Sequence, residues 1–327
     1  MRAVVLDEHG DVDVLEIREV PDPVPGPEEV LVHVASTALN RADLLQRMGL
    51  YPGPPAELEI PGMEFAGTVA AVGDRVLATK VGDPVMGIVG GGAYAQRLVT
   101  HERLLLAVPE SVPLADAAAI PEVFITAFDA LVVQGGLTSG RTALVHAGAS
   151  GVGTAAIQIA RAIGATIIVT ASTDKVDACR GLGADLAVDY RTDDFVDAVS
   201  EFTGGAGVDV ILDVIGGDYV NRNIRCVATD GRIIQVGVME SGAAQVNVGA
   251  LLPKRASLIG TTLRGRPIEQ KITITRRFAA EMLPLFDSGR LRPVIDSHFP
   301  LDQIAAAHQH MHANANVGKI VIVIDIA

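Results

Sequence analysis

The sequence predicts an α/β protein in which a doubly wound parallel sheet of six strands is inserted into an irregular, β-rich second domain. Three observations carry this prediction. A glycine-rich turn joins an apolar run of strand length to an amphipathic helical segment, and further strand-like runs follow at helix-sized intervals. Before position 120 the chain consists of short strands broken by Pro and Gly, and the same texture returns after position 290.

The glycine turn lies in the stretch 142–171, which reads TALVHA, GASGVG, TAAIQIARAIG and ATIIVTA. A strand, a turn of small residues, a helix and a second strand make one βαβ unit. Glycines let backbone N–H groups approach an anion closely, and the start of a helix attracts negative charge. The unit is therefore expected to bind the pyrophosphate of a dinucleotide. The structural alternative is a buried crossover whose glycines serve only close packing.

The central domain continues with apolar and β-branched runs separated by helical segments. Several runs are almost continuously apolar, as expected of parallel strands that helices cover on both faces. Right-handed crossovers join such strands into one sheet. The expected strands are 142–147, 166–171, 186–190, 208–214, 232–237 and 257–263, and the expected helices include 174–183, 193–203 and 218–228.

The flanking segments together predict the second domain. The N-terminal MRAVVLDEHG has the pattern of a first strand, and KIVIVI (319–324) has that of a last one. The nucleotide-binding domain is expected at 124–266, and the β-rich domain at 1–123 and 267–327.

Composition narrows the class of protein. The 327 residues are 49% apolar and carry a net charge of −13, which argues against a nucleic-acid partner. The N-terminus lacks the apolar core of a signal peptide, and Gln158 and Arg161 interrupt the longest apolar stretch. We therefore expect no membrane span and a cytoplasmic protein. Two distant cysteines, Cys179 and Cys226, support neither a disulfide framework nor a thiolate zinc site.

Five blocks of sequence, in the same order, resemble the medium-chain dehydrogenase/reductase superfamily. Within it the chain is similar to the zinc-free quinone oxidoreductase (zeta-crystallin-like) group, and there to the tumour-suppressor-inducible NADPH quinone oxidoreductases. The resemblance covers the whole chain and implies a Rossmann domain inserted into a GroES-like catalytic domain, with the site in the cleft between them. The blocks are ALNRADLLQRMGLYPGPP (38–55), AAAIPEVFITAFDAL (117–131), HAGASGVGTAAIQIAR (146–161), VDVILDVIGG (208–217) and ANANVGKIVI (313–322).

Zinc is not expected, although zinc alcohol dehydrogenases belong to the same superfamily. The resemblance puts Asn40 and Met63 at the positions of a Cys and a His ligand, and Glu122 near a second Cys. An amide, a thioether and a carboxylate do not form that Cys/His site. The four-cysteine lobe of a structural zinc is missing as well. The run HQHMH (308–312) is expected on an exposed helix rather than at a metal ion.

The expectation of NADPH rests on the residues that follow the second and third strands. NAD enzymes place an acidic residue after the second strand to bind the ribose, whereas this strand ends in Ser172. In the resembling family, Ser, Lys and Tyr at the places of Ser172, Lys175 and Tyr190 bind the 2′-phosphate of NADPH, and a lysine suits a dianion. Asp174 would soften this preference, and the alternative for Lys175 is a solvated residue in a helix first turn.

The glycine turn departs from the G-x-G-x-x-G pattern at its middle position. Gly148 and Gly153 fit the first and third glycines, but Ser150 occupies the second place. Its hydroxyl is expected either to face the nicotinamide pocket or to be satisfied locally.

The expected cofactor site draws on both domains. The resemblance puts Thr126 at a position that contacts the nicotinamide end, and Asn316 at one that reaches the cofactor from the returning C-terminal segment, with Asn314 as the alternative to Asn316. The full expected set is Asn40, Thr126, Gly148, Ser150, Gly151, Val152, Gly153, Ser172, Lys175, Tyr190, Ile215, Gly237, Val238, Leu263 and Asn316.

Tyr51 and Asn40 are the candidate catalytic residues. Tyr51 lies in a Pro/Gly-rich loop that borders the cleft in relatives. There it either donates a hydrogen bond or a proton to the acceptor, or closes the pocket as an aromatic wall. Asn40 is expected to hold the acceptor carbonyl or the nicotinamide ribose. Arg41 and Asp43 are expected to pair with each other around that loop.

These expectations converge on a zinc-independent oxidoreductase that transfers hydride from NADPH to quinones. A ketone needs a Lewis acid to stabilise charge on its oxygen, whereas a quinone or a conjugated enone delocalises that charge itself. The alternatives are an NADPH-dependent enal, enone or enoyl reductase and a protein that binds NADPH without turnover. The run 257–263 is expected at an open sheet edge, and the resemblance implies a homodimer formed through it.

Overall fold

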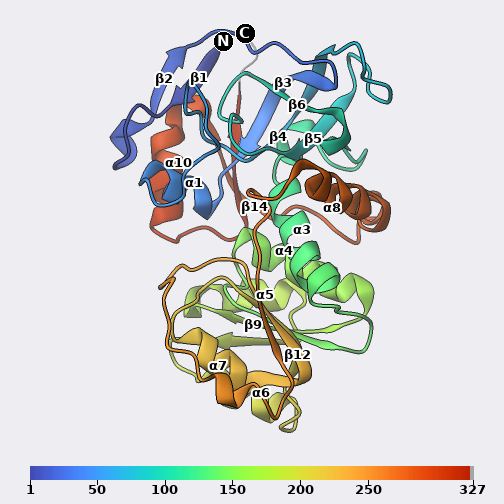
Figure 1. Ribbon diagram of the computed structural model, residues 1–327. Coiled ribbons are helices and arrows are strands. Elements are labelled where there is room, and N and C mark those ends of the chain that lie inside the picture. Colours follow the sequence, from blue (N-terminus) through green and yellow to red (C-terminus); the bar gives the residue numbers. More distant parts are fainter. Residues whose placement is uncertain (325–327) are drawn as a thin grey trace. The chain divides into compact units, whose positions relative to one another are not determined.

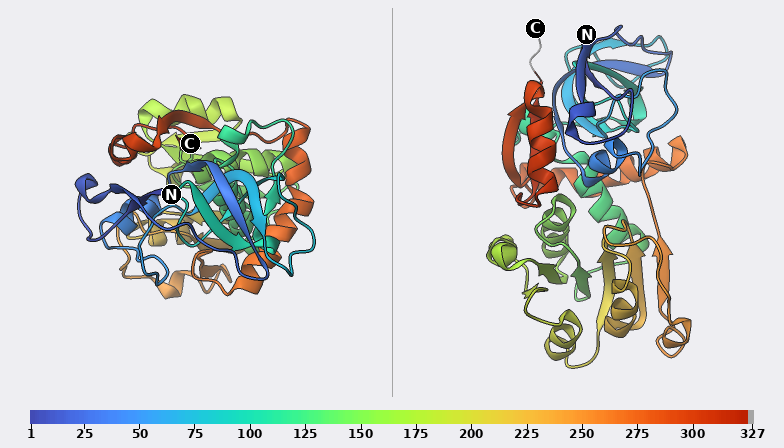
Figure 2. Two further views of the ribbon diagram at one scale, coloured as in Figure 1. Left: turned by 90° about the horizontal axis from the view of Figure 1, so that it is seen from above. Right: turned by 90° about the vertical axis from the view of Figure 1, so that its left-hand side faces the viewer.

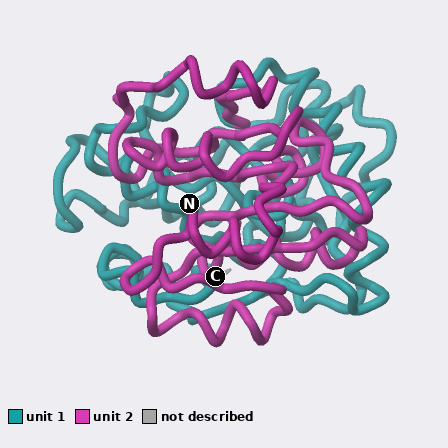
Figure 3. Tube along the Cα trace, turned by 90° about the horizontal axis from the view of Figure 1, so that it is seen from below, with its two compact units in different colours: residues 1–125, 264–327 teal, residues 126–263 magenta. Residues whose placement is uncertain are grey.

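The chain folds into two compact units, which Figure 3 shows in different colours. The computed structural model describes residues 1–324. Unit 1 combines Met1–Ile125 with Arg264–Ala327, and unit 2 is Thr126–Leu263. The boundaries expected from sequence lie after 123 and after 266. Among the described helices, none combines the length and the apolar character that crossing a membrane requires.

Unit 2 is built on a six-stranded sheet with the order β10-β9-β8-β11-β12-β13. All of its strand pairs are parallel. This order confirms the predicted doubly wound Rossmann sheet, in which the chain starts at the centre, runs to one edge and returns to build the other half. The strands are β8 (Thr142–Val145), β9 (Thr166–Ala171), β10 (Leu186–Asp189), β11 (Val208–Asp213), β12 (Val227–Gln235) and β13 (Ser257–Gly260).

Two pairs of helices pack on this sheet (Figures 1 and 2). Helices α4 and α5 follow β8 and β9, whereas α6 and α7 follow β10 and β11. From β8 to β10 the chain adds strands toward one edge of the sheet, and from β11 to β13 it adds them toward the other edge. Since every crossover is right-handed, the two pairs of helices lie on opposite faces of the sheet. The helices of unit 2 are α4 (Gly151–Ile163), α5 (Val176–Leu182), α6 (Phe195–Phe202) and α7 (Tyr219–Cys226), with the short turns η4 (Thr173–Lys175) and η5 (Val248–Ala250). Ahead of them, α3 (Pro121–Phe128) continues into the π-helical turn η3 (Asp129–Gln134).

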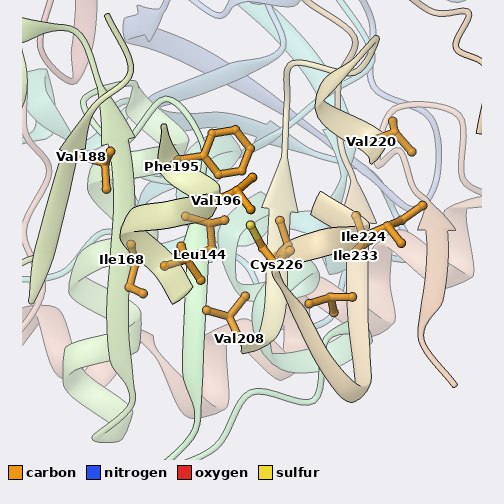
Figure 4. Packing of buried hydrophobic residues seen from close by; sticks show 13 residues of the cluster. Leu144, Ile168, Val188, Phe195, Val196, Val208, Val220, Ile224, Cys226 and Ile233 are labelled. Carbon is orange, nitrogen blue, oxygen red and sulfur yellow. The ribbon is translucent and has the colours of Figure 1, made fainter. Parts of the chain in front are cut away.

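The sheet face beneath α6 and α7 carries a continuous apolar core (Figure 4). Branched strand residues at alternate positions meet the apolar sides of the two helices, and burying such side chains stabilises a fold by about 25 cal/mol per Å². Core members include Leu144, Ile168, Ile211 and Ile233 from the strands, Phe195 and Val196 from α6, and Val220 and Ile224 from α7.

Two strand ends differ from the prediction by three residues or more. Strand β12 begins at Val227 rather than at 232, and β13 ends at Gly260 rather than at 263. Gly260 lies opposite Gln235, the last residue of β12. The Thr261 N–H still donates to the Gln235 carbonyl. Beyond this bond β12 has ended, so β13 has no partner and ends too. Leu263, an expected cofactor contact, lies beyond the strand and is partly buried.

Unit 1 is β-rich, as the predicted GroES-like domain requires. Its seven-stranded sheet has the order β14-β15-β3-β4-β5-β7, with β6 also paired to β3, and β1 pairs with β2. Strand β15 runs antiparallel to β3, with Val321 opposite Ala38, so the two chain segments of unit 1 share one sheet. The strands are β1 (Arg2–Val5), β2 (Glu16–Glu19), β3 (Glu29–Ala38), β4 (Glu64–Val72), β5 (Pro84–Ile88), β6 (Arg97–His101), β7 (Leu106–Ala107), β14 (Ile295–Pro300) and β15 (Lys319–Val323).

The helices of unit 1 are mostly short, and α10 carries part of the core. Its residues Ile304, Ala307 and Met311 are buried in a cluster with Ile320 and Ile322 of β15. The helices are α1 (Arg41–Arg47), α2 (Leu114–Ala117), α8 (Ile268–Glu281), α9 (Leu283–Asp287) and α10 (Ile304–His312), with the turns η1 (Val12–Val14), η2 (Glu102–Leu104) and η6 (Leu301–Gln303).

Candidate functional site

The turn between β8 and α4 is shaped for an anion. A Cβ on Gly148 would stand 2.6 Å from the Cβ of Val169, and one on Gly153 would stand 2.4 Å from the carbonyl oxygen of Ala147. Ala147 itself has a positive φ of 56°. Only glycine fits these two close approaches. The first-turn N–H groups of α4, which lack intrahelical partners, suit a dinucleotide pyrophosphate.

Ser150 is the N-cap of α4. Its Oγ accepts a hydrogen bond from the Gly153 N–H at 3.0 Å, which is the local role named above. The hydroxyl hydrogen remains able to serve a second partner because a hydroxyl both accepts and donates. Gly151 and Val152, the next expected cofactor contacts, form the first turn of the helix and are partly buried.

The three residues expected around a 2′-phosphate lie together at the ends of two neighbouring strands. Asp189 of β10 pairs with Ala171 of β9, and the Tyr190 N–H donates to the Ala171 carbonyl. Ser172 is 3% exposed and Lys175 is 6% exposed, whereas Tyr190 is 42% exposed. The burial of Lys175 contradicts the alternative in which it is a solvated surface residue.

Asp174 lies beside these three residues, and its charge is partly offset. A hydrogen bond from the Ser172 side chain is the main reason why the pKa of Asp174 is lowered. The guanidinium of Arg191 is 3.6 Å from its carboxylate. A small hydroxyl, a buried lysine and a nearby arginine together fit a dianionic phosphate.

Side chains at the ends of β11 and β12 fix the loops that contain Ile215 and Gly237. Asp213 Oδ1 accepts from the Ile215 N–H at 2.6 Å, and the Gln235 amide donates to the Gly237 carbonyl at 2.6 Å. Val238, the next expected contact, is 52% exposed. These loops are therefore held by their own strand ends before any ligand binds.

A buried chain of hydrogen bonds connects the ends of β8, β9 and β11. Asp213 Oδ2 accepts from the Asn223 amide at 2.8 Å, so the amide oxygen of Asn223 faces His146 Nε2, also at 2.8 Å. His146 Nε2 must then carry the hydrogen, and Nδ1 accepts from the Thr170 hydroxyl at 3.0 Å. Burial lowers the pKa of His146 and favours this neutral form.

Unit 1 contains a buried network of charges around Asn40. The Lys319 ammonium lies 2.7 Å from Glu64 Oε1 and 2.7 Å from Asn40 Oδ1, and it also donates to the Leu39 carbonyl. The Asn40 amide donates to Glu64 Oε1 at 2.8 Å. Glu64 Oε2 accepts from the backbone N–H of Glu122 at 2.8 Å. Glu64 is 0% exposed and Lys319 is 3% exposed.

This network does not fit a zinc ion. The Asn40 amide oxygen already binds an ammonium, whose positive charge opposes a second cation. Met63 is buried and offers only a thioether, and Glu122 contributes its backbone N–H to Glu64. Over residues 1–324, no three His, Cys, Asp or Glu side chains gather closely enough to hold a metal ion. The donor chemistry at this place favours a hydrogen-bonded structural role.

Asp43 extends the buried network but does not pair with Arg41, so that expectation is wrong. Its Oδ2 accepts from the Asn40 N–H at 2.8 Å and from the Tyr94 hydroxyl at 3.1 Å. Burial raises the pKa of Asp43 to about 6. Arg41 stays outside the network because Asp43 turns into the core as the N3 residue of α1, where its carboxylate caps the helix.

The run 308–312 was expected on an exposed helix, but the histidines of α10 differ in exposure. His308 is 0% exposed, and its Nε2 lies 3.4 Å from the Tyr94 hydroxyl. His310 pairs with Asp296 at 2.8 Å, and His312 is exposed. Burial, followed by the positive charge of Arg47, lowers the pKa of His308 to about 3.

The remaining expected site residues divide between the two units. In unit 1, Tyr51 is partly buried in the loop after α1, and Asn316 is 7% exposed with its amide donating to the Gly318 carbonyl. Asn314 is exposed and has a positive φ of 54°. Thr126, 8% exposed, opens unit 2. The residues expected on the phosphate side therefore all lie in unit 2, whereas Asn40, Tyr51 and Asn316 belong to unit 1.

Sequence reasoning missed Glu64, Lys319 and Tyr94, which belong to the buried network of unit 1. A usable signal existed for Lys319, because a lysine that opens the apolar run KIVIVI must find a partner when the strand is buried. The identity of that partner, 255 residues away in the sequence, carried no local signal.

Comparisons with known proteins identify the family. The zinc-binding dehydrogenase family matches residues 151–280, and the alcohol dehydrogenase GroES-like domain matches residues 26–110. Human quinone oxidoreductase is 31% identical over 329 residues, which cover 99% of this chain and 98% of that protein. The chain belongs to the medium-chain dehydrogenase/reductase superfamily and, within it, to the quinone oxidoreductase-like group.

Solved structures with the same fold carry several activities in their names. Escherichia coli quinone oxidoreductase in complex with NADPH has a TM-score of 0.89 at 28% identity, covering 99% of this chain and 100% of its own. An NAD-dependent alcohol dehydrogenase has a TM-score of 0.89 at 32% identity, covering 99% and 100%. The CurK enoyl reductase has a TM-score of 0.88 at 28% identity, covering 99% of each chain. This chain is an oxidoreductase of a superfamily whose members use a nicotinamide cofactor.

Proposed function

We propose that this chain is a zinc-independent NADPH:quinone oxidoreductase. The observation that carries the proposal is the buried network of Asn40, Glu64 and Lys319. Asn40 stands where zinc-dependent relatives have a ligand, and its amide is instead hydrogen-bonded to an internal ion pair. Without a Lewis acid, the acceptor must stabilise its own developing charge, which quinones do.

The cofactor is proposed to be NADPH rather than NADH. Ser172 leaves room where NAD enzymes place an acidic side chain, and the buried Lys175 supplies a positive charge beside it. The first turn of α4 would hold the pyrophosphate, while Ile215, Gly237, Val238, Leu263, Thr126 and Asn316 would line the rest of the cofactor. When bound, NADPH supplies the hydride.

The chain's own residues then position and shield the reacting groups. Tyr51 would form a wall of the acceptor site and exclude water, while the network around Asn40 holds that residue and the start of α1 in place. A reduced quinone takes up protons from solvent, so no side chain has to act as a strong acid. Asn40, whose amide is engaged inside the protein, is proposed to act mainly as a positioning residue.

The deciding experiment is NADPH oxidation against a panel of quinones, enones and enoyl thioesters, with and without chelator. We expect quinone turnover that chelation leaves unchanged. Stoichiometric zinc that is lost together with activity would contradict the proposal. Turnover restricted to enones or enoyl thioesters would support the second candidate, an NADPH-dependent enal, enone or enoyl reductase, which the likeness to the CurK enoyl reductase favours. NADPH binding without any turnover would point to a non-catalytic protein.

The proposed assembly is a homodimer through the edge strand β13. In the described part of the chain, β13 pairs only with β12 and closes one edge of the sheet. Leu258 on this strand is 39% exposed, and an apolar open edge favours pairing with a second copy. Light scattering should give a dimeric mass for the native chain and a monomeric mass for Ile259→Pro. A monomeric native protein would refute this assembly.

A further inference from the structure

Arg264, which follows Leu263 in the sequence, joins two loops of unit 1 through one guanidinium group. Its Nε–H donates to the Gly90 carbonyl at 2.7 Å, and one Nη donates to Gln46 Oε1 at 2.7 Å. The other Nη lies 3.4 Å from the Tyr51 carbonyl. The guanidinium carbon stands 5.0 Å from the centre of the Tyr51 ring, within the range of a cation–π contact.

The segment held in this way has little support of its own. Between the end of α1 at Arg47 and the start of β4 at Glu64, the chain forms no helix or strand. It contains Gly49 and Gly53 together with several prolines. A Cβ on Gly53 would stand 2.8 Å from the Gln46 amide nitrogen and 3.2 Å from an Arg264 Nη. Glycine at this position therefore lets the loop lie directly against the guanidinium.

A second layer of contacts fixes the Gln46 side of this arrangement. Gln46 is 1% exposed, and its amide nitrogen donates to Glu59 Oε1 at 2.8 Å. The other Glu59 oxygen lies 3.3 Å from His9 Nε2. The Gln46 carbonyl oxygen is consequently oriented toward Arg264 rather than free to rotate.

The acceptors that bind Arg264 are all neutral. Its hydrogen bonds go to two backbone carbonyls and one side-chain amide. Its positive charge contributes, after burial, to the lowered pKa of Lys271. Three nitrogens of one planar guanidinium reach three separate acceptors. A lysine, with its single ammonium group, cannot reproduce this arrangement.

We propose that Arg264 is a positioning residue that fixes the Tyr51 loop and thereby sets the size of the acceptor that the enzyme takes. This inference rests on the proposed function, because Tyr51 matters to specificity only if it forms a wall of the acceptor site. The guanidinium holds both the backbone and the ring of Tyr51, so it restricts how far the wall can move outward. Loosening the contact should admit bulkier acceptors and weaken the fit of small ones.

The first test measures the loop without any activity. The chain has no Trp, so Leu50→Trp, at a position 69% exposed, introduces a single fluorescent reporter beside Tyr51. In this background, Arg264→Met and Arg264→Lys should raise the share of anisotropy lost to nanosecond motion by about twofold or more. Gly53→Ala should also increase the motion of the loop, because its added Cβ would push Gln46 and Arg264 apart. Arg277→Met, which removes a surface arginine of α8 paired with Glu281, is the matched control and should leave the loop unchanged.

The second test compares a small and a bulky quinone, for example benzoquinone and phenanthrenequinone. The Arg264 variants should raise KM for benzoquinone about five- to tenfold with kcat within about threefold, and shift the ratio of kcat/KM toward the bulky quinone by about tenfold. An unchanged ratio would overturn the inference even if the loop moved more. If the wild-type chain reduces neither quinone, the proposed function fails, and the anisotropy measurement still decides whether Arg264 holds the loop.

Discussion

The two units bury polar groups in different ways. Unit 1 encloses the ion pair Lys319–Glu64 and a further carboxyl, Asp43, whereas the buried array of unit 2 joins the Asp213 carboxylate to the neutral side chains of Asn223, His146 and Thr170. Its partners also lie closer in sequence, since Asn223 follows Asp213 by 10 residues. A buried ion pair makes each partner indispensable to the other, while an array in which one carboxylate is bonded only to uncharged side chains can lose one of its hydrogen bonds at lower cost.

The sharpest test of this contrast is Lys319→Met, which leaves Glu64 charged and unpaired in the interior. We expect a loss of about 3–5 kcal/mol in the free energy of unfolding. The double variant Lys319→Met, Glu64→Gln should recover most of this loss because no isolated charge remains. Asn223→Leu in unit 2 should cost only about 1–3 kcal/mol. Urea unfolding of the three variants provides the measurement, and equal losses for the single and double variants would remove the basis of the comparison.

The pH dependence of stability tests the titratable groups of unit 1. The pKa of Asp43 rises on folding from 3.8 to about 6, so its contribution to stability decreases as pH rises between these values. The pKa of His308 falls from 6.5 to about 3, so stability is lost as pH drops through that range. Because the two effects oppose each other, the native chain should change little in stability between roughly pH 4 and 6.

Single substitutions should separate the two contributions. Asp43→Asn should make the chain lose stability in acid, on the order of a few kcal/mol by pH 4, and His308→Phe should reverse that slope. Thermal unfolding as a function of pH would show both effects. Parallel slopes in the two variants would mean that the groups do not titrate as described.

For unit 2, the corresponding test removes the positive charge of Lys175, which is expected to face the cofactor. Lys175→Ala should weaken NADPH binding about tenfold or more, roughly 1.4 kcal/mol, and leave NADH binding almost unchanged. Titration by nicotinamide fluorescence measures both affinities. Arg180→Ala, which breaks an exposed pair with Asp177, serves as the control. NADPH binding that survives in Lys175→Ala would contradict the assignment of the 2′-phosphate.

The smallest effect is expected at the Tyr51 hydroxyl. Tyr51→Phe keeps the ring beneath Arg264 and should keep kcat within about threefold, whereas Tyr51→Ala should mainly raise KM. Steady-state kinetics on one quinone distinguishes the two. A loss of about a hundredfold in kcat for Tyr51→Phe, roughly 2.7 kcal/mol, would instead make Tyr51 a catalytic acid.

Unit 2 was predictable because its information is local. Apolar runs such as 166–171 and the spacing of Gly148 and Gly153 determine strand, turn and helix within a few residues. The expected phosphate-side residues Ser172, Lys175 and Tyr190 meet because they follow neighbouring strands. The start of β12 was missed because Val227–Gln235 includes Asp230 and Gly231, which read as a turn.

Unit 1 was less predictable because its polar residues find distant partners. Nothing near Asp43 indicates Tyr94, and nothing near His308 indicates that it is buried. The run 308–312 is expected on an exposed helix, but His308 lies on the same side of α10 as the core residues Ala307 and Met311 and is buried. The helix α8 was overlooked because its alternation of Ile and Thr resembles a strand.

The pairing of β15 with β3 has a consequence for synthesis on the ribosome. A nascent chain folds from its N-terminus as residues emerge, at about 5–20 residues per second. Unit 2 is continuous in sequence and can fold once its last strand has emerged, but Glu64 must wait for Lys319, 255 residues later. At these rates the interval lasts on the order of 10–50 seconds. During that time the edge of β3 that will pair with β15 remains unpaired in the first segment of unit 1. Unpaired strand edges promote aggregation, so this is the stage at which we expect chaperone binding to matter most.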